Sequence, residues 1–190
     1  MKLIIASGNA GKLREIRAIL GEKFEEIYSM KEAGIDHETV EDGNTFMENA
    51  LKKAREMAQI SGSAALADDS GICVDALGGA PGVYSARFCG KHGDDEANNR
   101  LLVEKMRSQA DRRAHYACYV ALVITDGREV CAEGKLYGEI VDIPKGEGGF
   151  GYDPYFYLPD YGCTAAELSA EEKNKISHRA VALQALLRQL

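Results

Sequence analysis

The sequence contains no long hydrophobic run. None of its segments approaches the roughly 18 uninterrupted apolar residues of a membrane-spanning helix, so we expect no membrane partner. The opening stretch, residues 1–6, becomes polar too soon for a secretory signal peptide and is typical of a first β-strand. Internal repeats, low-complexity segments and linkers rich in Ser and Pro are also missing. These absences favour a single domain that spans residues 1–190.

The sequence also has no block of basic residues. Lys and Arg number 23 against 30 Asp and Glu, which gives a formal net charge of −7 and a pI near 5.2. Proteins that bind a nucleic-acid backbone offer a surplus of cations, because phosphate neutralisation supplies most of their affinity. We therefore expect no nucleic-acid partner. Any bound phosphates should meet a few placed cations and a divalent metal.

The five cysteines form no pattern typical of a zinc site or a disulfide framework. Their number is odd, they are widely spaced, and no C-x-x-C pair or Cys/His cluster occurs. This usage is typical of reduced thiols and predicts a cytoplasmic protein. Because the sequence places no activating partner near any of them, a thiol mechanism is unsupported.

The residues that are present describe an ordinary globular chain. Apolar residues make up 45% and charged residues 28% of the sequence, which excludes a disordered chain. A chain of this length should bury roughly 70% of its unfolded surface. We therefore expect a core large enough to need no disulfide or structural metal.

Apolar spacing and turn signals predict alternating strands and helices. Thr45-x-x-Glu48 and Thr164-x-x-Glu167 both match a helix capping box, and Asp126-Gly127 is a strong signal for a tight hairpin. Because helices alternate with strands early and the hairpin stands apart, we predict a mixed α/β domain of two lobes with a cleft. The predicted strands cover residues 3–6, 25–29, 64–67, 114–125 and 128–140, and the predicted helices cover residues 12–20, 46–58, about 94–107 and about 177–190.

The loop after the first strand is typical of phosphate binding. In Ser7-Gly8-Asn9-Ala10-Gly11 the glycines let the backbone approach an anion, the following helix offers N–H groups, and Lys12 adds a charge. A Walker A loop would need Gly in place of Ala6 and Ser or Thr in place of Leu13. The alternative interpretation is a plain glycine turn with a solvated lysine.

The second candidate is Asp68-Asp69-Ser70-Gly71, directly after an apolar strand. Carboxylates at the C-terminal end of a strand point into the crevice where α/β folds bind ligands. Mg²⁺ prefers oxygen ligands, and the acidic cluster of Glu38, Glu41 and Asp42 could supply a second carboxylate. A polar turn is the alternative, because Asp and Ser are common in turns.

A glycine-rich loop near the C-terminus carries aromatic residues. Its Gly146-x-Gly148-x-x-Gly151 pattern matches the dinucleotide fingerprint, but no helix follows it, so we reject that interpretation. The loop could instead stack Phe150 and Tyr152 on a flat base while Asp153 reads its edge. Buried aromatic packing is the commoner fate of such residues.

Cations gather around one histidine near the C-terminus. Lys173, Lys175 and Arg179 lie within seven residues of sequence that also hold Ser177 and His178. This segment could bind an anion or the edge of a base. The alternative is a solvated start to the last helix.

In this order and at these distances, the segments resemble the inosine triphosphate pyrophosphatase-like family, the pyrophosphatases of non-standard purine nucleoside triphosphates (XTP/dITP diphosphatases). The resemblance covers nearly the whole chain. It rests on the blocks at residues 7–12, 67–71, 74–87, 149–154, 164–168 and 173–179.

The resemblance implies hydrolysis of ITP, dITP and XTP to the nucleoside monophosphate and pyrophosphate, with Mg²⁺ as cofactor. It also implies an elongated two-lobed α/β domain with a central substrate cleft, and a homodimer. Asp69 would be the proton acceptor and a metal ligand, with Glu41 as second ligand, although the acidic patch here is shorter than the family's usual carboxylate run. Substrate contacts would come from Ser7, Gly8, Asn9, Ala10, Gly11, Lys12, Lys53, Ser70, Phe150, Gly151, Tyr152, Asp153, Lys173, His178 and Arg179.

The choice between purine bases would depend on the hydrogen-bonding groups at the edge of each base. Hypoxanthine and xanthine carry a 6-oxo acceptor and an N1–H donor, whereas adenine carries a 6-amino donor. If His178 or Arg179 donates to O6, adenine leaves buried groups unpaired and is rejected. Two rival functions stay open: a P-loop-type NTPase that cleaves the terminal phosphate, and a nucleotide sensor without turnover.

Overall fold

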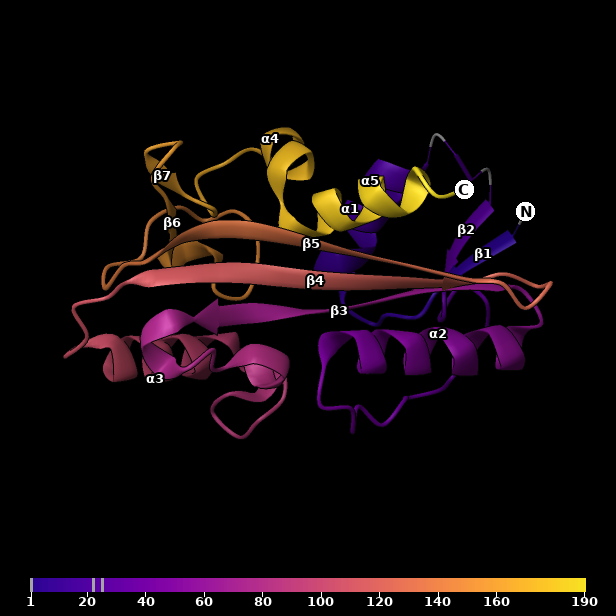
Figure 1. Ribbon diagram of the computed structural model, residues 1–190, viewed down its shortest axis with the longest axis horizontal. Helices are drawn as coiled ribbons and strands as arrows, with labels where there is room; N and C mark the ends of the chain where they lie inside the picture. The colour runs from indigo at the N-terminus through magenta and orange to yellow at the C-terminus, as the bar shows by residue number, and fades with distance from the viewer. Residues whose placement is uncertain (1, 22, 25) are drawn as a thin grey trace. The chain divides into compact units, whose positions relative to one another are not determined.

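The computed structural model describes residues 2–21, 23, 24 and 26–190. Its strands form one sheet in the order β2-β1-β3-β4-β5-β6-β7, flanked by helices (Figure 1). Among the described residues, no helix is both long and apolar enough to cross a membrane. The strands are β1 (Lys2–Ile5), β2 (Glu26–Ser29), β3 (Ala64–Val74), β4 (Arg113–Val123), β5 (Glu129–Ile140), β6 (Phe156–Leu158) and β7 (Cys163–Thr164). The α-helices are α1 (Ala10–Leu20), α2 (Phe46–Ser61), α3 (Asp95–Met106), α4 (Ala170–Ile176) and α5 (His178–Leu187), and short 3-10 helices cover Asp75–Leu77, Gly82–Arg87 and Asp153–Tyr155.

The sheet is mixed, which confirms the predicted fold class. β1 pairs in parallel with both β2 and β3, whereas β6 pairs antiparallel with β5 and β7. The predicted turn between β4 and β5 also forms, since the Ile124 N–H donates to the Arg128 carbonyl across Asp126-Gly127 at 2.9 Å. Gly127 has φ +87°, a backbone conformation that favours glycine.

The chain divides into two compact units. Unit 1 contains the described residues up to Asp69, together with Cys118–Gly134 and His178–Leu190. Unit 2 contains Ser70–Ala117 and Lys135–Ser177. Each of β3, β4 and β5 contributes residues to both units. The expectation of a single two-lobed domain with a central cleft stays a prediction.

Unit 1 packs helices on both faces of its strands, and the alternation of side chains along each strand decides which face a residue joins. On β3, Ala64 and Leu66 are fully buried in a cluster with residues of α1 and α5. Ala65 and Ala67 are fully buried in a second cluster with residues of α2. Figure 1 shows α1 and α5 on one side of these strands and α2 on the other. The next two residues of the strand continue the two rows.

The N-termini of the two longer helices in unit 1 follow from local hydrogen bonds. The side chain of Asn9 accepts from the Lys12 N–H at 3.0 Å, so α1 begins at Ala10 rather than after the glycine loop. On α2, Thr45 and Glu48 exchange the two hydrogen bonds of the predicted capping box.

Unit 2 has its own core. Ile72 and Val74 of β3 pack with Leu102 of α3 and with the strands β4 and β6. The ring of Phe156, which is fully buried, tilts against the ring of Tyr116 with centroids 4.6 Å apart.

The strand predicted at residues 64–67 is too short. β3 continues to Val74, so Asp68 and Asp69 lie inside a strand and not at its C-terminal end. The sequence Asp-Asp-Ser-Gly is typical of a turn, but here Gly71 lets the strand pass close to the chain beside it. An added Cβ at Gly71 would lie 2.3 Å from the Gly82 carbonyl oxygen.

The C-terminal helices also differ from the prediction. No helix begins at Thr164, whose N–H donates to the Glu167 carboxylate at 2.7 Å in a turn. Instead α4 begins at Ala170 behind a capping box of Ser169 and Glu172, and α5 then ends at Leu187. Of the strand predicted at residues 25–29, β2 covers Glu26–Ser29, and residue 25 lies outside the described residues.

Candidate active site

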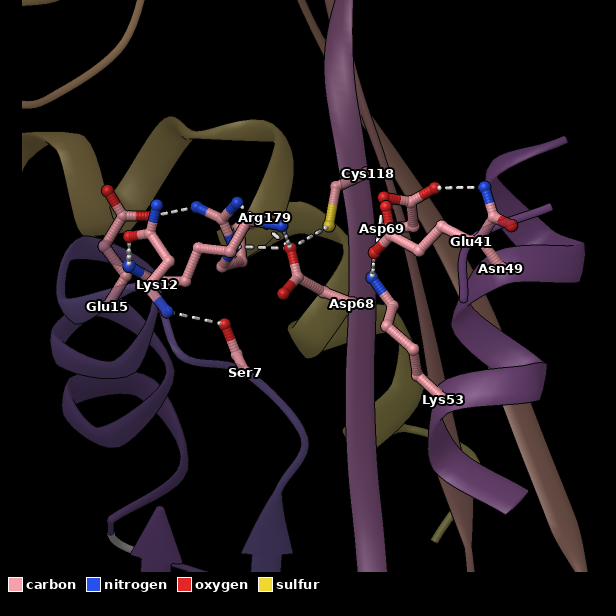
Figure 2. Close-up of polar contacts among 11 residues, drawn as sticks. Ser7, Lys12, Glu15, Glu41, Asn49, Lys53, Asp68, Asp69, Cys118 and Arg179 are labelled. Atoms are coloured by element: carbon pink, nitrogen blue, oxygen red, sulfur yellow. Dashed lines mark hydrogen bonds and ion pairs between the residues drawn. The ribbon is translucent and has the colours of Figure 1, made fainter. Parts of the chain in front are cut away.

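Two neighbouring carboxylates on β3 lie on opposite sides of the strand. Asp68 continues the row that faces α1 and α5, and Asp69 continues the row that faces α2, as Figure 2 shows. The sequence predicted that the pair would point together into one crevice. That prediction is wrong, because both residues lie within an extended strand where successive side chains alternate.

Asp68 is the centre of a buried charge cluster. Its Oδ2 lies 2.9 Å from the Nζ of Lys12, and accepts hydrogen bonds from the Nε and Nη2 of Arg179 at 3.2 and 3.1 Å. Burial would raise the pKa of Asp68, but the charges of Lys12 and Arg179 outweigh burial and hold the pKa far below its ordinary value. Asp68 is therefore a permanent anion at neutral pH.

Arg179 joins this cluster to α1. Its side chain is 1% exposed, and its Nη1 donates to the carboxylate of Glu15, which lies one turn after Lys12. Burial would lower the pKa of Arg179, but the charge of Asp68 leads the effects that raise it. The thiol of Cys118 lies 4.0 Å from Asp68 Oδ2, and burial raises the pKa of this thiol to about 12. Cys118 is thus an inert part of the core.

Asp69 has a different environment. Its Oδ2 accepts from the Nδ2 of Asn49 at 3.0 Å, and its Oδ1 lies 3.6 Å from the Nζ of Lys53. Burial raises the pKa of Asp69, and the charge of Lys53 only partly offsets this effect. A carboxylate whose pKa is raised toward neutrality is a better proton acceptor than one held as a permanent anion.

Glu41 meets the same ammonium from the loop before α2. The Nζ of Lys53 donates to Glu41 Oε1 at 2.6 Å. Burial would lower the pKa of Lys53, but the charges of Asp69, Asp68 and Glu41 raise it overall. Lys53 is therefore a fixed cation between two carboxylates from different elements.

The donors around Lys53 suit a magnesium ion that is shared with a substrate. Mg²⁺ is usually held by one or two carboxylates and completes its shell with phosphates and water. Glu41 and Asp69 supply two such carboxylates, already gathered around one positive charge. Throughout residues 2–21, 23, 24 and 26–190, no group of three or more His, Cys, Asp or Glu forms a metal cage.

The phosphate loop lies where β1 ends. The Ser7 hydroxyl accepts from the Asn9 N–H at 3.2 Å, and Asn9 in turn caps α1. β1 pairs with β3 as far as Ile5, and the Ala6 N–H donates to the Leu66 carbonyl, after which β3 continues past the end of β1 through Asp68 and Asp69. Gly8, Asn9 and Ala10 are exposed, and Lys12 is partly exposed.

Unit 2 holds the other predicted residues in a second cluster. The carboxylate of Asp153 accepts from the Phe150 N–H at 2.9 Å and from the Nζ of Lys173 at 2.6 Å, and that Nζ lies 4.7 Å from the centre of the Phe150 ring. Asp153 and Lys173 are 2% and 6% exposed, so their ion pair is preformed. Gly149 must be glycine, because an added Cβ would lie 2.1 Å from Asp153 Oδ2.

The remaining predicted residues fall in both units. His178 is buried at the first position of α5 in unit 1. Gly151, Tyr152 and Ser70 belong to unit 2, where the Tyr152 hydroxyl donates to the Ser85 carbonyl at 2.7 Å. The role of each of these residues toward a substrate stays a prediction.

Two residues of the clusters were missed from the sequence. Glu15 lies three residues after Lys12, and Asn49 lies four residues before Lys53, so each shares a helix face with a predicted lysine. Asn49 is 1% exposed and also accepts from the Gly43 N–H at 2.8 Å, which joins the Glu41 loop to Asp69. The sequence did offer a signal for both residues, namely a polar side chain three or four residues from a predicted lysine on the apolar side of a helix.

Comparison with known proteins places these clusters in a family. The model of the Ham1 family matches residues 3–189. The dITP/XTP pyrophosphatase of Chromobacterium violaceum is 51% identical over 191 residues, covering 100% of this chain and 96% of that protein. The chain belongs to the Ham1 family.

Solved Ham1 proteins share the fold of this family member. The Staphylococcus aureus Ham1 protein matches with a TM-score of 0.87 at 40% identity, covering 100% of this chain and 99% of that one. The Coxiella burnetii HAM1 protein matches with a TM-score of 0.89 at 39% identity, covering 100% of both chains. These relatives of the Ham1 chain confirm the resemblance drawn from its sequence motifs.

Proposed function

We propose that this Ham1 protein hydrolyses non-standard purine nucleoside triphosphates, namely ITP, dITP and XTP, to the monophosphate and pyrophosphate, and so clears them from the nucleotide pool. The observation that carries the proposal is the contrast between Asp68 and Asp69. One carboxylate is locked as an anion, and the other is buried with a raised pKa beside a fixed ammonium. The dITP/XTP pyrophosphatase name of its relative supports the substrate class.

Asp69 accepts the proton of the attacking water. Its Oδ2 is held by Asn49 and its Oδ1 lies near Lys53, so the carboxylate has a fixed orientation. Attack at the α-phosphorus by a water so activated releases the monophosphate and pyrophosphate. Asp68 cannot share this role, because its carboxylate is bound to Lys12 and Arg179.

The charge that develops on the leaving pyrophosphate is met by cations. Lys53 and Lys12 come from α2 and α1 and stand on either side of β3, where β1 has ended and β3 continues. The loop of residues 7–11 adds backbone N–H groups at the start of α1. Fixed donors of this kind act without reorganisation in the transition state.

Glu41 and Asp69 are the residues that would hold Mg²⁺. When bound, the ion would neutralise phosphate oxygens and polarise the reacting phosphoryl group. Lys53 lies against both carboxylates, so its ammonium keeps them together before any substrate arrives.

The purine base is assigned to the Phe150 loop of unit 2. Phe150 supplies a flat face for stacking, and Asp153 supplies an acceptor that its contacts with Lys173 and the Phe150 N–H keep in place. A fixed acceptor suits the N1–H of hypoxanthine or xanthine and leaves adenine, whose N1 carries no hydrogen, without that bond. A donor to O6 from His178 or Arg179 stays an expectation drawn from the sequence.

A product assay tests this function directly. The protein is incubated with ITP, XTP, dITP, GTP or ATP, with and without Mg²⁺, and the products are separated. We expect pyrophosphate and monophosphate from ITP, XTP and dITP, with Mg²⁺ required. Orthophosphate and diphosphate would instead support a P-loop-type NTPase, and tight binding of ITP without product would support a nucleotide sensor.

The assembly and location implied by the resemblance belong to the same proposal. We expect a homodimer in the cytoplasm, with no nucleic-acid partner. Light scattering on a size-exclusion column should give twice the chain mass of 20.7 kDa. A single-chain mass at micromolar concentration would contradict the dimer.

A further inference from the structure

One glycine of the aromatic loop in unit 2 is held at both of its backbone polar groups. The Gly151 N–H donates to the Oδ2 of Asp95 at 3.1 Å, and the Gly151 carbonyl accepts from the Nδ2 of Asn99 at 2.9 Å. Gly151 directly follows Phe150 and has φ +65°, so few other residues could adopt its conformation. The loop is thus attached to α3 at this glycine.

The two side chains that hold Gly151 lie one turn apart on α3. Asp95 is the first residue of the helix and is exposed, whereas Asn99 is 8% exposed. Residues at this spacing share one helix face. Asparagine disfavours helix interiors, so a buried asparagine here needs a reason, and its bond to the loop supplies one.

The neighbouring asparagine holds a different segment. Asn98 is 1% exposed, accepts from the Cys89 N–H at 2.8 Å, and donates to the Ala86 carbonyl at 3.3 Å. The two asparagines therefore attach two segments to one helix. Asn98 binds residues 86–89, and Asn99 binds the loop that carries Phe150.

We propose that Asn99, together with Asp95, is a positioning residue for base recognition. The inference rests on the proposed function, in which Phe150 stacks on the purine. Gly149 and Gly151 both have positive φ, so the Phe150 segment would sample many conformations if it were held only at Asp153. The two bonds from α3 fix it before the substrate arrives, and such pre-organisation increases affinity.

The role predicts a particular kinetic signature. The proposed function assigns neither residue to the reacting phosphate, so Asn99→Ala should raise KM for ITP about tenfold, the scale of one lost hydrogen bond, with kcat within about twofold. ATP gains less from the ordered loop, so its kcat/KM should fall less. The ratio of kcat/KM for ITP over ATP should therefore narrow by about three- to tenfold.

Asp95 offers a second variant that does not disturb the core. Asp95→Ala removes the acceptor of the Gly151 N–H from an exposed position and should narrow the same ratio. Asp95→Asn keeps an acceptor oxygen, so its ratio of kcat/KM for ITP over ATP should stay close to the wild-type ratio. Because both residues act on one glycine, the double variant Asp95→Ala/Asn99→Ala should lose less than the product of the two single effects.

Asn98→Ala is the matched control. It removes the same residue type at the neighbouring buried position, so it should lower the melting temperature to a similar extent as Asn99→Ala. It should leave the ITP-over-ATP ratio unchanged, because Asn98 binds residues 86–89. If the ITP-over-ATP ratio narrowed equally in Asn98→Ala and Asn99→Ala, the cause would be a general loss of packing, and the positioning role would be overturned.

Amide exchange gives a readout that needs no turnover. Exchange of the Gly151 N–H should be faster in Asp95→Ala and Asn99→Ala than in the wild type and in Asn98→Ala. Normal pyrophosphate release from ITP with an unchanged ratio and unchanged Gly151 exchange would overturn the positioning role alone. A wild-type protein that releases no pyrophosphate from ITP would overturn the proposed function.

Discussion

Asp68 and Asp69 differ by one position in the chain, and the alternation of β3 gives them opposite environments. Asp68 lies among cations that lower its pKa, and Asp69 lies in a buried site that raises its pKa. The folded protein therefore favours the charge on Asp68 and disfavours the charge on Asp69. The same substitution at the two positions should have opposite consequences.

Asp69→Asn should abolish turnover and leave stability intact. The amide keeps an oxygen to accept from Asn49 and removes a charge that burial disfavours, but it cannot take a proton from water. We expect kcat for ITP to fall at least about 10²-fold, the lower end for loss of a general base. Asp42→Asn is the control, because it changes an exposed carboxylate that pairs with Lys52, and it should keep the wild-type kcat. Retention of near wild-type kcat would remove the proton acceptor from the mechanism.

Asp68→Asn should instead unfold the protein more easily. The change leaves the buried Arg179 and Lys12 without the anion that both contact, and breaking a buried ion pair destabilises by about 3–5 kcal/mol. Urea unfolding at pH 7 in EDTA measures the free energy of unfolding for this variant and for Asp69→Asn. A smaller loss for Asp68→Asn than for Asp69→Asn would contradict the assigned environments.

Glu32 makes a pH-dependent contribution to stability. Hydrogen bonds from the Ser29 N–H and hydroxyl, followed by Arg17, lower its pKa from 4.5 to about 2. Because the folded-state pKa is the lower one, this contribution is present above pH 4.5 and disappears as the pH falls from about 4.5 to about 2. Glu32→Gln should therefore lower the melting temperature at pH 7 and leave it nearly unchanged at pH 2. An equal lowering of the melting temperature at the two pH values would contradict this contribution.

At the scale of elements, local sequence signals predicted most of what formed. The capping box at Thr45, the hairpin at Asp126-Gly127 and the helical spacing in α1 all depend on residues close in sequence. The length of β3 could not be predicted, because its extension past Ser70 depends on contacts of Gly71 with the segment around Gly82. A turn-like sequence became a strand through packing that the sequence does not display.

The contact of β5 with α5 depends on one glycine. An added Cβ at Gly134 would lie 2.2 Å from the His178 carbonyl oxygen and 2.4 Å from the Ala182 nitrogen. Gly134→Ala should move the first turn of α5, lower stability by about 1–3 kcal/mol as overpacking does, and reduce kcat/KM for ITP by displacing Arg179. Glu133→Ala, exposed on the same strand, should change neither quantity. Thermal unfolding and ITP kinetics compare the two variants, and equal results would mean that α5 tolerates the shift.

At the scale of the whole molecule, the sequence predicted the site's residues better than their arrangement. Motif matching identified Lys12, Lys53 and Asp69, and the structure gathers each into a buried or half-buried charge cluster. It missed Glu15 and Asn49, whose importance depends on partners 164 and 20 residues away in the chain. Residue types and short spacings are visible in a sequence, whereas the face of a strand and a distant partner require the fold.

Binding and chemistry can be separated in the intact protein through ligand-linked stability. In Asp69→Asn, which should bind without turnover, ITP at a hundredfold excess over its Kd stabilises the folded state by about 2.7 kcal/mol. For a chain of this size that corresponds to a rise in melting temperature of about 5–10 °C. ATP at the same concentration should give a smaller rise, because Asp153 finds no N1–H donor on adenine.

The added variant Phe150→Ala decides whether the base or the triphosphate causes the shift. With the phosphate contacts intact, Asp69→Asn/Phe150→Ala should give a smaller rise with ITP than Asp69→Asn does, because the base has lost its stacking face. Asp153 is unchanged, so the rise with ITP should still exceed the rise with ATP. Inorganic tripolyphosphate is the control ligand, and it should stabilise both variants equally because it carries no base. An ITP shift that survives Phe150→Ala in full would place the stacking face for the base outside the Phe150 loop.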